Sequence, residues 1–200
     1  MIRVEDIAAD PRFRRLASVP GIDVDLRYVG RNNFAGRVLY GTLDCAWLRA
    51  EAAVGLQAAA AWLAVQRPGW RIRVLDALRP QRVQEAIWVD VAATPLQEYF
   101  ANPERGSIHS FGMAVDVTLL AADGREVDMG SGFDEMSTAS HPALHDELLA
   151  SGRLTPAHVA ARDCLLAAMT QGGFHGITNE WWHFDHGDRN AVRQTMPRIY

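Results

Sequence analysis

The segment from residue 113 to residue 119 constrains the fold more than any other part of the sequence. Its apolar residues alternate with small or polar ones, which is typical of a half-buried β-strand. This strand would present Asp116 on its second face. Gly112 directly precedes it and can adopt the positive φ that a tight turn requires. We therefore expect a fold in which a bend leads into a strand that carries an acidic side chain.

Other patterns predict a mixture of helices and strands. Helices are expected over Cys45–Gln66 with Asp44 as N-cap, over Gln81–Val91, and from Thr155-Pro156 to Gly172-Gly173. Strands are expected over Arg71–Asp76 and Glu180–Asp185, with a turn at Asp123-Gly124. The order of the elements is mixed, so we expect an α+β fold with a small antiparallel sheet flanked by helices. We find no repeat or linker, and we expect a single domain over residues 1–200.

Charge and hydropathy argue against several classes of protein. The net charge is −4 and the arginines are scattered, so a nucleic-acid partner is not expected. The most apolar stretch, residues 52–65, is shorter than the ~20 residues that span a bilayer, so no membrane partner is expected. The first seven residues include Glu5 and Asp6, whereas a signal peptide needs a basic start followed by an apolar run. Cys45 and Cys164 stand alone in apolar patterns. We therefore expect a cytoplasmic protein with reduced cysteines.

Two of the seven histidines have the sequence neighbours that a metal site requires. His109 precedes Asp116 by seven positions, and His183 follows Glu180 by three. On a straight strand His109 and Asp116 would lie roughly 23 Å apart, so they can share a metal only if the chain bends at Gly112. Two histidines and one aspartate leave the fourth position of a zinc ion free for water, as in catalytic zinc sites. Other divalent metals are compatible with the same donors.

Glu180 and Arg79 are candidates for the remaining chemistry. In a continuous strand Glu180 and His183 would face opposite ways, so Glu180 belongs in the turn that enters the strand, where it can act as a general base. Arg79, at a strand-to-helix corner, fits either an ordinary salt bridge or the stabilisation of an oxyanion. Core positions are expected for Trp181, Trp182 and Phe184, and surface or capping positions for His141, His145, His158, His175 and His186. Asp185 is expected to support a ligand or to face solvent.

Several stretches occur in a specific order along the chain. They are Asp25-Leu26-Arg27-Tyr28 followed by Asn32-Asn33-Phe34, Leu78-Arg79-Pro80, Ser107-x-His109-x-x-Gly112-x-x-x-Asp116, an acidic, Gly-rich loop over residues 128–136, and Glu180-Trp181-Trp182-His183. In this order they resemble the D-alanyl-D-alanine dipeptidases of the vancomycin-resistance type, zinc peptidases related to D-Ala-D-Ala carboxypeptidases and to the Hedgehog signalling domain. One departure is Ala77-Leu78, where a more polar or aromatic dipeptide is expected.

The resemblance implies a Hedgehog/D,D-peptidase-like zinc peptidase fold and one zinc ion per chain. His109, Asp116 and His183 would be the ligands of that ion. Glu180 would be the general base that takes a proton from the attacking water and passes it to the leaving amine. Arg79 would polarise the scissile carbonyl and stabilise the oxyanion. The implied reaction is the hydrolysis of D-alanyl-D-alanine to two D-alanines.

The resemblance also implies a site closed around a small dipeptide. Ser107 would bind the C-terminal carboxylate, Asp134 the free ammonium group, and Tyr28 would form part of the pocket wall. Two alternatives remain at this stage. A peptidoglycan D,D-carboxypeptidase or endopeptidase is disfavoured by the lack of an export signal, and a non-catalytic zinc-dependent binding domain is disfavoured by the presence of Glu180 and Arg79. The sequence does not indicate the oligomeric state.

Overall fold

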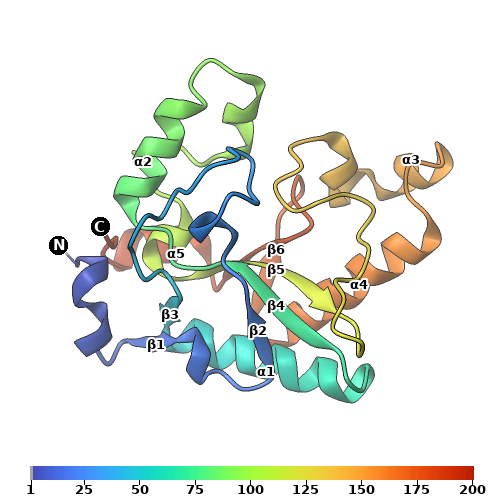
Figure 1. Cartoon of the computed structure of the whole chain (residues 1–200), viewed down its shortest axis with the longest axis horizontal. Coiled ribbons are helices and arrows are strands. Elements are labelled where there is room, and N and C mark those ends of the chain that lie inside the picture. The colour runs from blue at the N-terminus through green and yellow to red at the C-terminus, as the bar shows by residue number, and fades with distance from the viewer. Residues whose placement is uncertain (1) are drawn as a thin grey trace.

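The computed structural model describes residues 2–200, so Met1 lies outside the described part of the predicted domain. Its centre is a five-stranded sheet (Figure 1), in the order β2 (Ile22–Val24), β4 (Arg71–Asp76), β5 (Ala114–Leu120), β7 (His183–His186) and β6 (Phe174–Gly176). All neighbouring strands are antiparallel except β2, which runs parallel to β4. The predicted α+β class with a small antiparallel sheet is confirmed, and the parallel edge strand is an addition to it.

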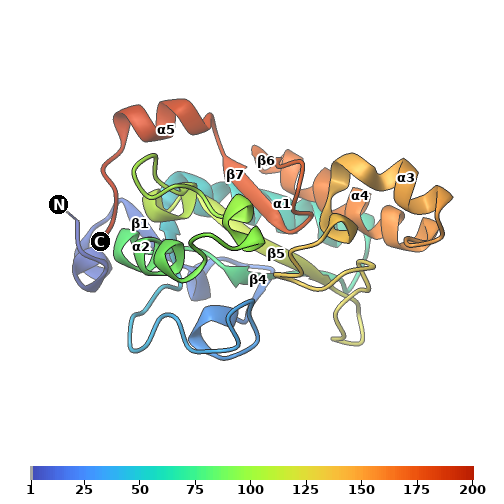
Figure 2. The ribbon, with the colours of Figure 1, turned by 90° about the horizontal axis from the view of Figure 1, so that it is seen from above.

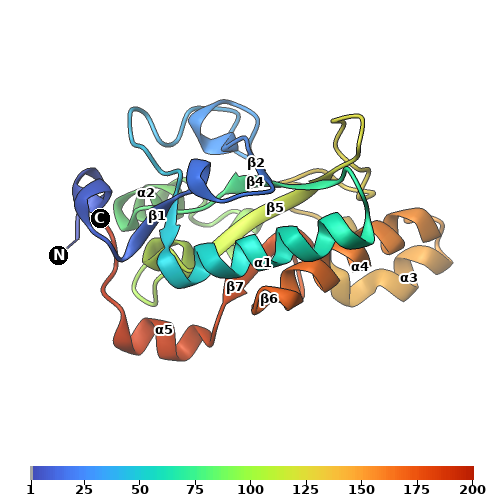
Figure 3. The ribbon, with the colours of Figure 1, turned by 90° about the horizontal axis from the view of Figure 1, so that it is seen from below.

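Helices cover one face of this sheet. Figure 3 shows α1 (Ala50–Gln66) and α4 (Pro156–Gln171) packed side by side beneath the strands. Figure 2 shows α5 (Arg189–Thr195) and α3 (His145–Ala150) at opposite ends of the molecule. The remaining regular elements are α2 (Gln81–Asp90), the pair β1 (Phe13–Arg15) and β3 (Trp47–Arg49), and 3-10 turns at Val4–Ala9, Leu16–Ser18, Arg27–Val29, Pro95–Tyr99, Ile108–Phe111, Thr138–Ser140 and Pro142–Leu144.

The first helix is shorter than the sequence predicts. It begins at Ala50 rather than Cys45, and Asp44 accepts a hydrogen bond from the Ala46 N–H instead of capping the helix. Residues 47–49 form β3, which pairs with β1 and buries Leu48 completely. The Arg49 N–H also donates to the Gly112 carbonyl at 2.9 Å. These contacts between distant segments outweigh the local helical pattern, which extends further toward the N-terminus.

The central strand β5 is buried on both faces, whereas the alternation predicts a half-buried strand. Val115, Val117 and Leu119 belong to the main core together with residues of α1 and α4. Because successive side chains of a strand point to opposite faces, Asp116 points away from these helices. The prediction was wrong about exposure because alternation cannot reveal that loops cover the second face.

The other predicted elements agree with the structure to within a few residues. β4, α2 and α4 lie where they are expected, and Thr155 caps α4 in a capping box with His158. The last strand begins at His183 rather than at Glu180. Both cysteines are free thiols. Within residues 2–200, no helix is long and apolar enough to cross a membrane.

Candidate active site

Three polar residues form a row across the middle of the sheet. Asp116 on β5 lies directly opposite His183 on β7 and, on its other side, opposite Asp76 on β4. Directly opposed residues of antiparallel strands project from the same face, with Cβ atoms about 4.5–5.5 Å apart. The register of the sheet therefore brings these three side chains together on the face opposite α1 and α4.

A β-bulge in β4 is needed to bring Asp76 into this row. Val74 pairs with Val117 and Asp76 pairs with Asp116, so Leu75 is an extra residue on β4. Without the bulge Asp76 would project from the same face as Val74, into the hydrophobic core. Asp76 was not among the predicted site residues, because nothing in the local sequence reveals the bulge.

His109 reaches the row from the 3-10 turn Ile108–Phe111. Gly112 ends this turn in the left-handed conformation, with a φ of 71°, and its N–H donates to the His109 carbonyl at 3.0 Å. The predicted bend is therefore confirmed. A Cβ atom at Gly112 would also lie 3.3 Å from the Arg49 nitrogen. The Nδ1 atom of His109 is fixed by the Ala77 carbonyl at 2.7 Å.

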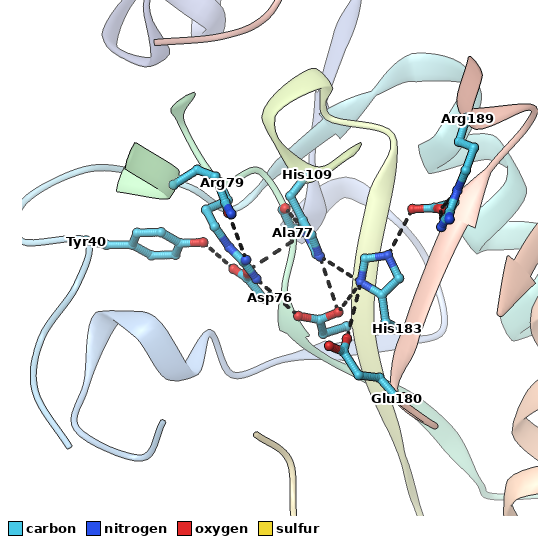
Figure 4. Close-up of polar contacts among 11 residues, drawn as sticks. Tyr40, Asp76, Ala77, Arg79, His109, Glu180, His183 and Arg189 are labelled. Atoms are coloured by element: carbon cyan, nitrogen blue, oxygen red, sulfur yellow. Dashed lines mark hydrogen bonds and ion pairs between the residues drawn. The ribbon is translucent and has the colours of Figure 1, made fainter. Parts of the chain in front are cut away.

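The side chains of His109, Asp116 and His183 converge on one point (Figure 4). His109 Nε2 lies 3.1 Å from His183 Nδ1, and Asp116 Oδ1 lies 3.0 Å from His183 Nδ1 and 3.3 Å from His109 Nε2. A tetrahedral zinc ion with bonds of roughly 2.0–2.2 Å separates its donor atoms by about 3.3–3.6 Å. The three atoms are therefore spaced closely enough to share one ion.

The outer nitrogen of each imidazole has an acceptor. His109 Nδ1 donates to the Ala77 carbonyl, and His183 Nε2 lies 2.9 Å from Asp185 Oδ1. In neutral rings the two facing nitrogens then carry lone pairs and cannot bond to each other. Although burial opposes charge, Asp185 and Asp116 raise the pKa of His183 well above its usual value. The position between the rings therefore favours a cation, and the donor set fits zinc.

Glu180 stands beside this triad. Glu180 lies before β7 and not in it, as predicted. It is only 7% exposed. Its Oε2 atom lies 3.9 Å from His183 Nδ1, and Figure 4 shows its carboxylate directed toward the triad. Burial raises the pKa of Glu180 to about 7, which lies in the range suited to a general base near neutral pH.

Arg79 lies on the other side of Asp116. Its Nε and Nη2 atoms donate to Asp76 Oδ2 at 3.0 and 2.7 Å, and Nη2 also lies 3.4 Å from Asp116 Oδ2. Nη1 donates to Gln84 Oε1 at 3.2 Å, and the guanidinium group lies over the Tyr28 ring at 4.9 Å. Tyr40 donates to the second oxygen of Asp76. Arg79 is thus held rigidly, and Asp116 contacts both Arg79 and the two histidines.

Every residue predicted for the site lines one cavity of about 430 Å³. These residues are Tyr28, Arg79, Ser107, His109, Asp116, Asp134, Glu180 and His183. Among the described residues Ala77 and Leu78 are buried and do not line the cavity. The departure from the family pattern at these two positions therefore does not alter the cavity wall.

Asp134 occupies an unusual backbone conformation in this cavity. Its φ is 58°, in the left-handed region that glycine, asparagine and aspartate adopt more readily than other residues. Its Oδ2 atom accepts from the Phe34 N–H at 3.1 Å. Burial, and then the charge of Asp116, raise the pKa of Asp134 well above its usual value. A cationic partner would offset both the burial of the carboxylate and its repulsion by Asp116.

The site also contains residues that the sequence interpretation missed or left open. Asp185 supports His183, and Arg189 on α5 donates to Asp185 Oδ2 at 3.0 Å through its Nε atom. Arg189 and Arg193 both line the cavity. Their spacing of four positions would place them on one face of a helix, but the short helix α5 was not predicted.

Comparisons with known proteins identify the family of the chain. The sequence model of a peptidase family described as D-ala-D-ala dipeptidase matches residues 12–199. A D-alanyl-D-alanine dipeptidase of Escherichia coli is 37% identical over 166 residues, which cover 83% of this chain and 79% of the relative. Dipeptidases of the same name from Synechocystis and Enterococcus faecium are 31% and 30% identical and cover 64% and 83% of this chain, and 64% and 86% of their own length.

Proposed function

The chain belongs to the D-Ala-D-Ala dipeptidase family of metallopeptidases, and from this premise we propose that it hydrolyses D-alanyl-D-alanine to two D-alanines. One zinc ion per chain would be held by His109 Nε2, Asp116 Oδ1 and His183 Nδ1. The observation that carries the proposal is the pair of imidazole nitrogens 3.1 Å apart, each oriented by a hydrogen bond at its far side. Two such nitrogens and a carboxylate oxygen form a donor set for a metal with an open position.

The residues around the triad supply the rest of the chemistry. When bound, zinc would act as a Lewis acid toward the carbonyl and make a water molecule more acidic. Glu180, with a pKa near 7, takes the proton of the attacking water and delivers it to the leaving amine. Arg79 keeps one Nη1 hydrogen without a partner among residues 2–200, and this donor stabilises the negative charge that develops on the carbonyl oxygen.

Two residues would bind the two charged ends of the dipeptide. Asp134 binds the ammonium group of the dipeptide, and Ser107 contributes a hydroxyl at the carboxylate end. Tyr28 forms the wall beneath Arg79. A cavity that buries both charged ends favours free dipeptides, because a longer peptide would leave one of these groups without its partner. This argument disfavours a carboxypeptidase or endopeptidase, and the buried base and arginine disfavour a binding domain without turnover.

A substrate panel tests this function. The purified protein is incubated with D-Ala-D-Ala, L-Ala-L-Ala, D-Ala-D-lactate and a stem pentapeptide, with and without a chelator. We expect hydrolysis of D-Ala-D-Ala alone, lost with the chelator and restored by zinc. Hydrolysis of the pentapeptide would instead favour a carboxypeptidase, and hydrolysis that survives complete removal of metal would refute the proposed centre.

The domain boundaries, the location in the cell and the absence of a nucleic-acid partner remain proposals. A single dipeptidase domain over residues 1–200 is supported by the family match over residues 12–199. Location in the cytoplasm is an expectation from the sequence alone, and fractionation of the native host would test it. A nucleic-acid partner is not expected because the net charge is −4, and the oligomeric state needs a measurement in solution.

A further inference from the structure

Helix α5 contributes two arginines, Arg189 and Arg193, to the cavity wall. Figure 4 shows Arg79 and Arg189 on opposite sides of the two imidazoles, and the hydrogen bonds from Arg79 through Asp116 and His183 to Asp185 and Arg189 follow the same order. Arg193 follows Arg189 by four positions and lines the same cavity, as does the exposed Arg105. This side of the cavity is rich in guanidinium groups.

Arg193 differs from Arg189 in what it binds. The guanidinium group of Arg189 is paired with Asp185. Arg193 donates through Nε to the Gly106 carbonyl at 3.1 Å, and its buried Nη1 atom has no partner among the described residues. A buried donor without a partner is unfavourable, so an anion that supplies an acceptor here stabilises this group.

The charges around Arg193 point to the same kind of ligand. Burial, and then the nearby charges of Arg105, Arg189 and Arg198, lower the pKa of Arg193 below its ordinary value. Asp185, its acidic neighbour, already binds His183 and Arg189. An incoming carboxylate would therefore relieve repulsion between arginines and would have no competing carboxylate to displace.

The position of Arg193 connects it to the proposed substrate. Gly106, whose carbonyl holds the guanidinium group, directly precedes Ser107 in the cavity wall. Asp134 lies at the Arg79 side, because it binds the N–H of Phe34, whose ring packs on Tyr28 beneath Arg79. A dipeptide with its ammonium group at Asp134 and its scissile carbonyl at the triad extends its carboxylate toward α5.

Resting on the proposed function, we propose that Arg193, assisted by Arg105, is the specificity residue that binds the free C-terminal carboxylate of the dipeptide. Ser107 alone supplies a neutral hydroxyl and cannot distinguish a carboxylate from an amide by charge. The guanidinium group supplies that distinction through charge-assisted hydrogen bonds.

Binding to a variant that does not turn over tests this role. In the Glu180→Gln background, calorimetry gives the Kd of D-Ala-D-Ala and of its C-terminal amide, with and without Arg193→Gln or Arg193→Lys. We expect Arg193→Gln to weaken binding of the acid about 10- to 100-fold, to leave the amide unchanged, and Arg193→Lys to recover part of the loss. Arg125→Gln, at an exposed position, controls for the change in net charge.

The outcomes separate this proposal from the proposed function. Equal weakening of acid and amide would show a structural role for Arg193 and overturn the proposal. Binding of the acid that is unaffected by Arg193→Gln would overturn it as well. So would binding of the acid to the Glu180→Gln parent that is unmeasurable or no tighter than binding of the amide. Hydrolysis by the unmodified protein is measured separately. Failure to cleave D-Ala-D-Ala would reject the proposed function, whereas the ratio of the two Kd values would still decide the role of Arg193.

Discussion

The two halves of the cavity are built differently. The metal half consists of His109, Asp116 and His183, and each has a second partner inside the protein: the Ala77 carbonyl, Arg79 and Asp185. Two of its three side chains lie on central strands. The fold itself therefore determines the geometry of this half.

The substrate half consists of Ser107, Asp134 and Arg193, which lie on loops and on the short helix α5. Each keeps a polar group that no described residue satisfies: the Ser107 hydroxyl, Oδ1 of Asp134 and Nη1 of Arg193. These groups are therefore free to bind a ligand. Changes in the metal half should therefore alter metal content or kcat, and changes in the substrate half should alter KM.

The largest effect is expected from His183→Ala. This variant removes one of three donors and leaves Asp116 without its closest partner, so the protein should lose zinc and its hydrolytic activity should fall to background. Zinc per chain after gel filtration measures this directly. His175→Ala, at an exposed position on β6, is the matched control and should keep both. Stoichiometric zinc in His183→Ala would remove this residue from the proposed ligands.

Glu180→Gln should separate metal binding from catalysis within the same half. Glutamine has nearly the same shape but cannot accept a proton, so kcat should fall roughly 10²- to 10⁴-fold while zinc content stays unchanged. Steady-state kinetics and metal analysis of one preparation provide both values. Glu147→Gln on α3, where the side chain is exposed, should have wild-type kinetics. Near-normal kcat in Glu180→Gln would contradict its role as the base.

Asp185→Asn tests the support behind the metal half. The asparagine can still accept from His183 Nε2, but it loses the charge that raises the basicity of the ring. Loss of such a partner typically lowers metal affinity roughly 10- to 100-fold. Competition with a chromogenic chelator gives the zinc Kd, and kcat at saturating zinc should change little. An unchanged Kd would mean that Asp185 only stabilises the fold.

Asp134→Asn should give the smallest effect, confined to the substrate half. Asparagine tolerates the positive φ at this position and can still accept from the Phe34 N–H, so only the charge is lost. KM for D-Ala-D-Ala should rise about tenfold, with zinc content and kcat nearly unchanged. An N-acetylated dipeptide, which has no ammonium group, should bind both proteins equally weakly. A loss confined to kcat would contradict the assignment of Asp134 to the substrate half.

The sequence predicts the site better than it predicts the fold around it. Parity along the strands required a bend at Gly112 and a position for Glu180 outside the strand; Gly112 has a left-handed φ, and Glu180 lies between bends that precede β7. These features follow from local rules, namely the two-residue period of a strand and the conformational freedom of glycine. Their consequence, that His109 and Asp116 face one another, could therefore be derived from residue order.

The parts that could not be predicted depend on contacts between distant segments. The bulge at Leu75 that brings Asp76 beneath Arg79 exists only in the pairing of β4 with β5. Residues 47–49 form a strand because β1 is available to pair with them. Arg193 becomes a candidate only when α5 places it over Gly106. None of these positions carries a local signal, because each is determined by tertiary packing.

Anomalous diffraction at the zinc absorption edge, from crystals grown with one equivalent of zinc, locates the metal relative to the two imidazoles. We predict a single peak within roughly 2.0–2.2 Å of His109 Nε2, Asp116 Oδ1 and His183 Nδ1, with the carboxylate of Glu180 beside it but not bound to it. A peak at other residues, or no peak between the two imidazoles, would contradict the account.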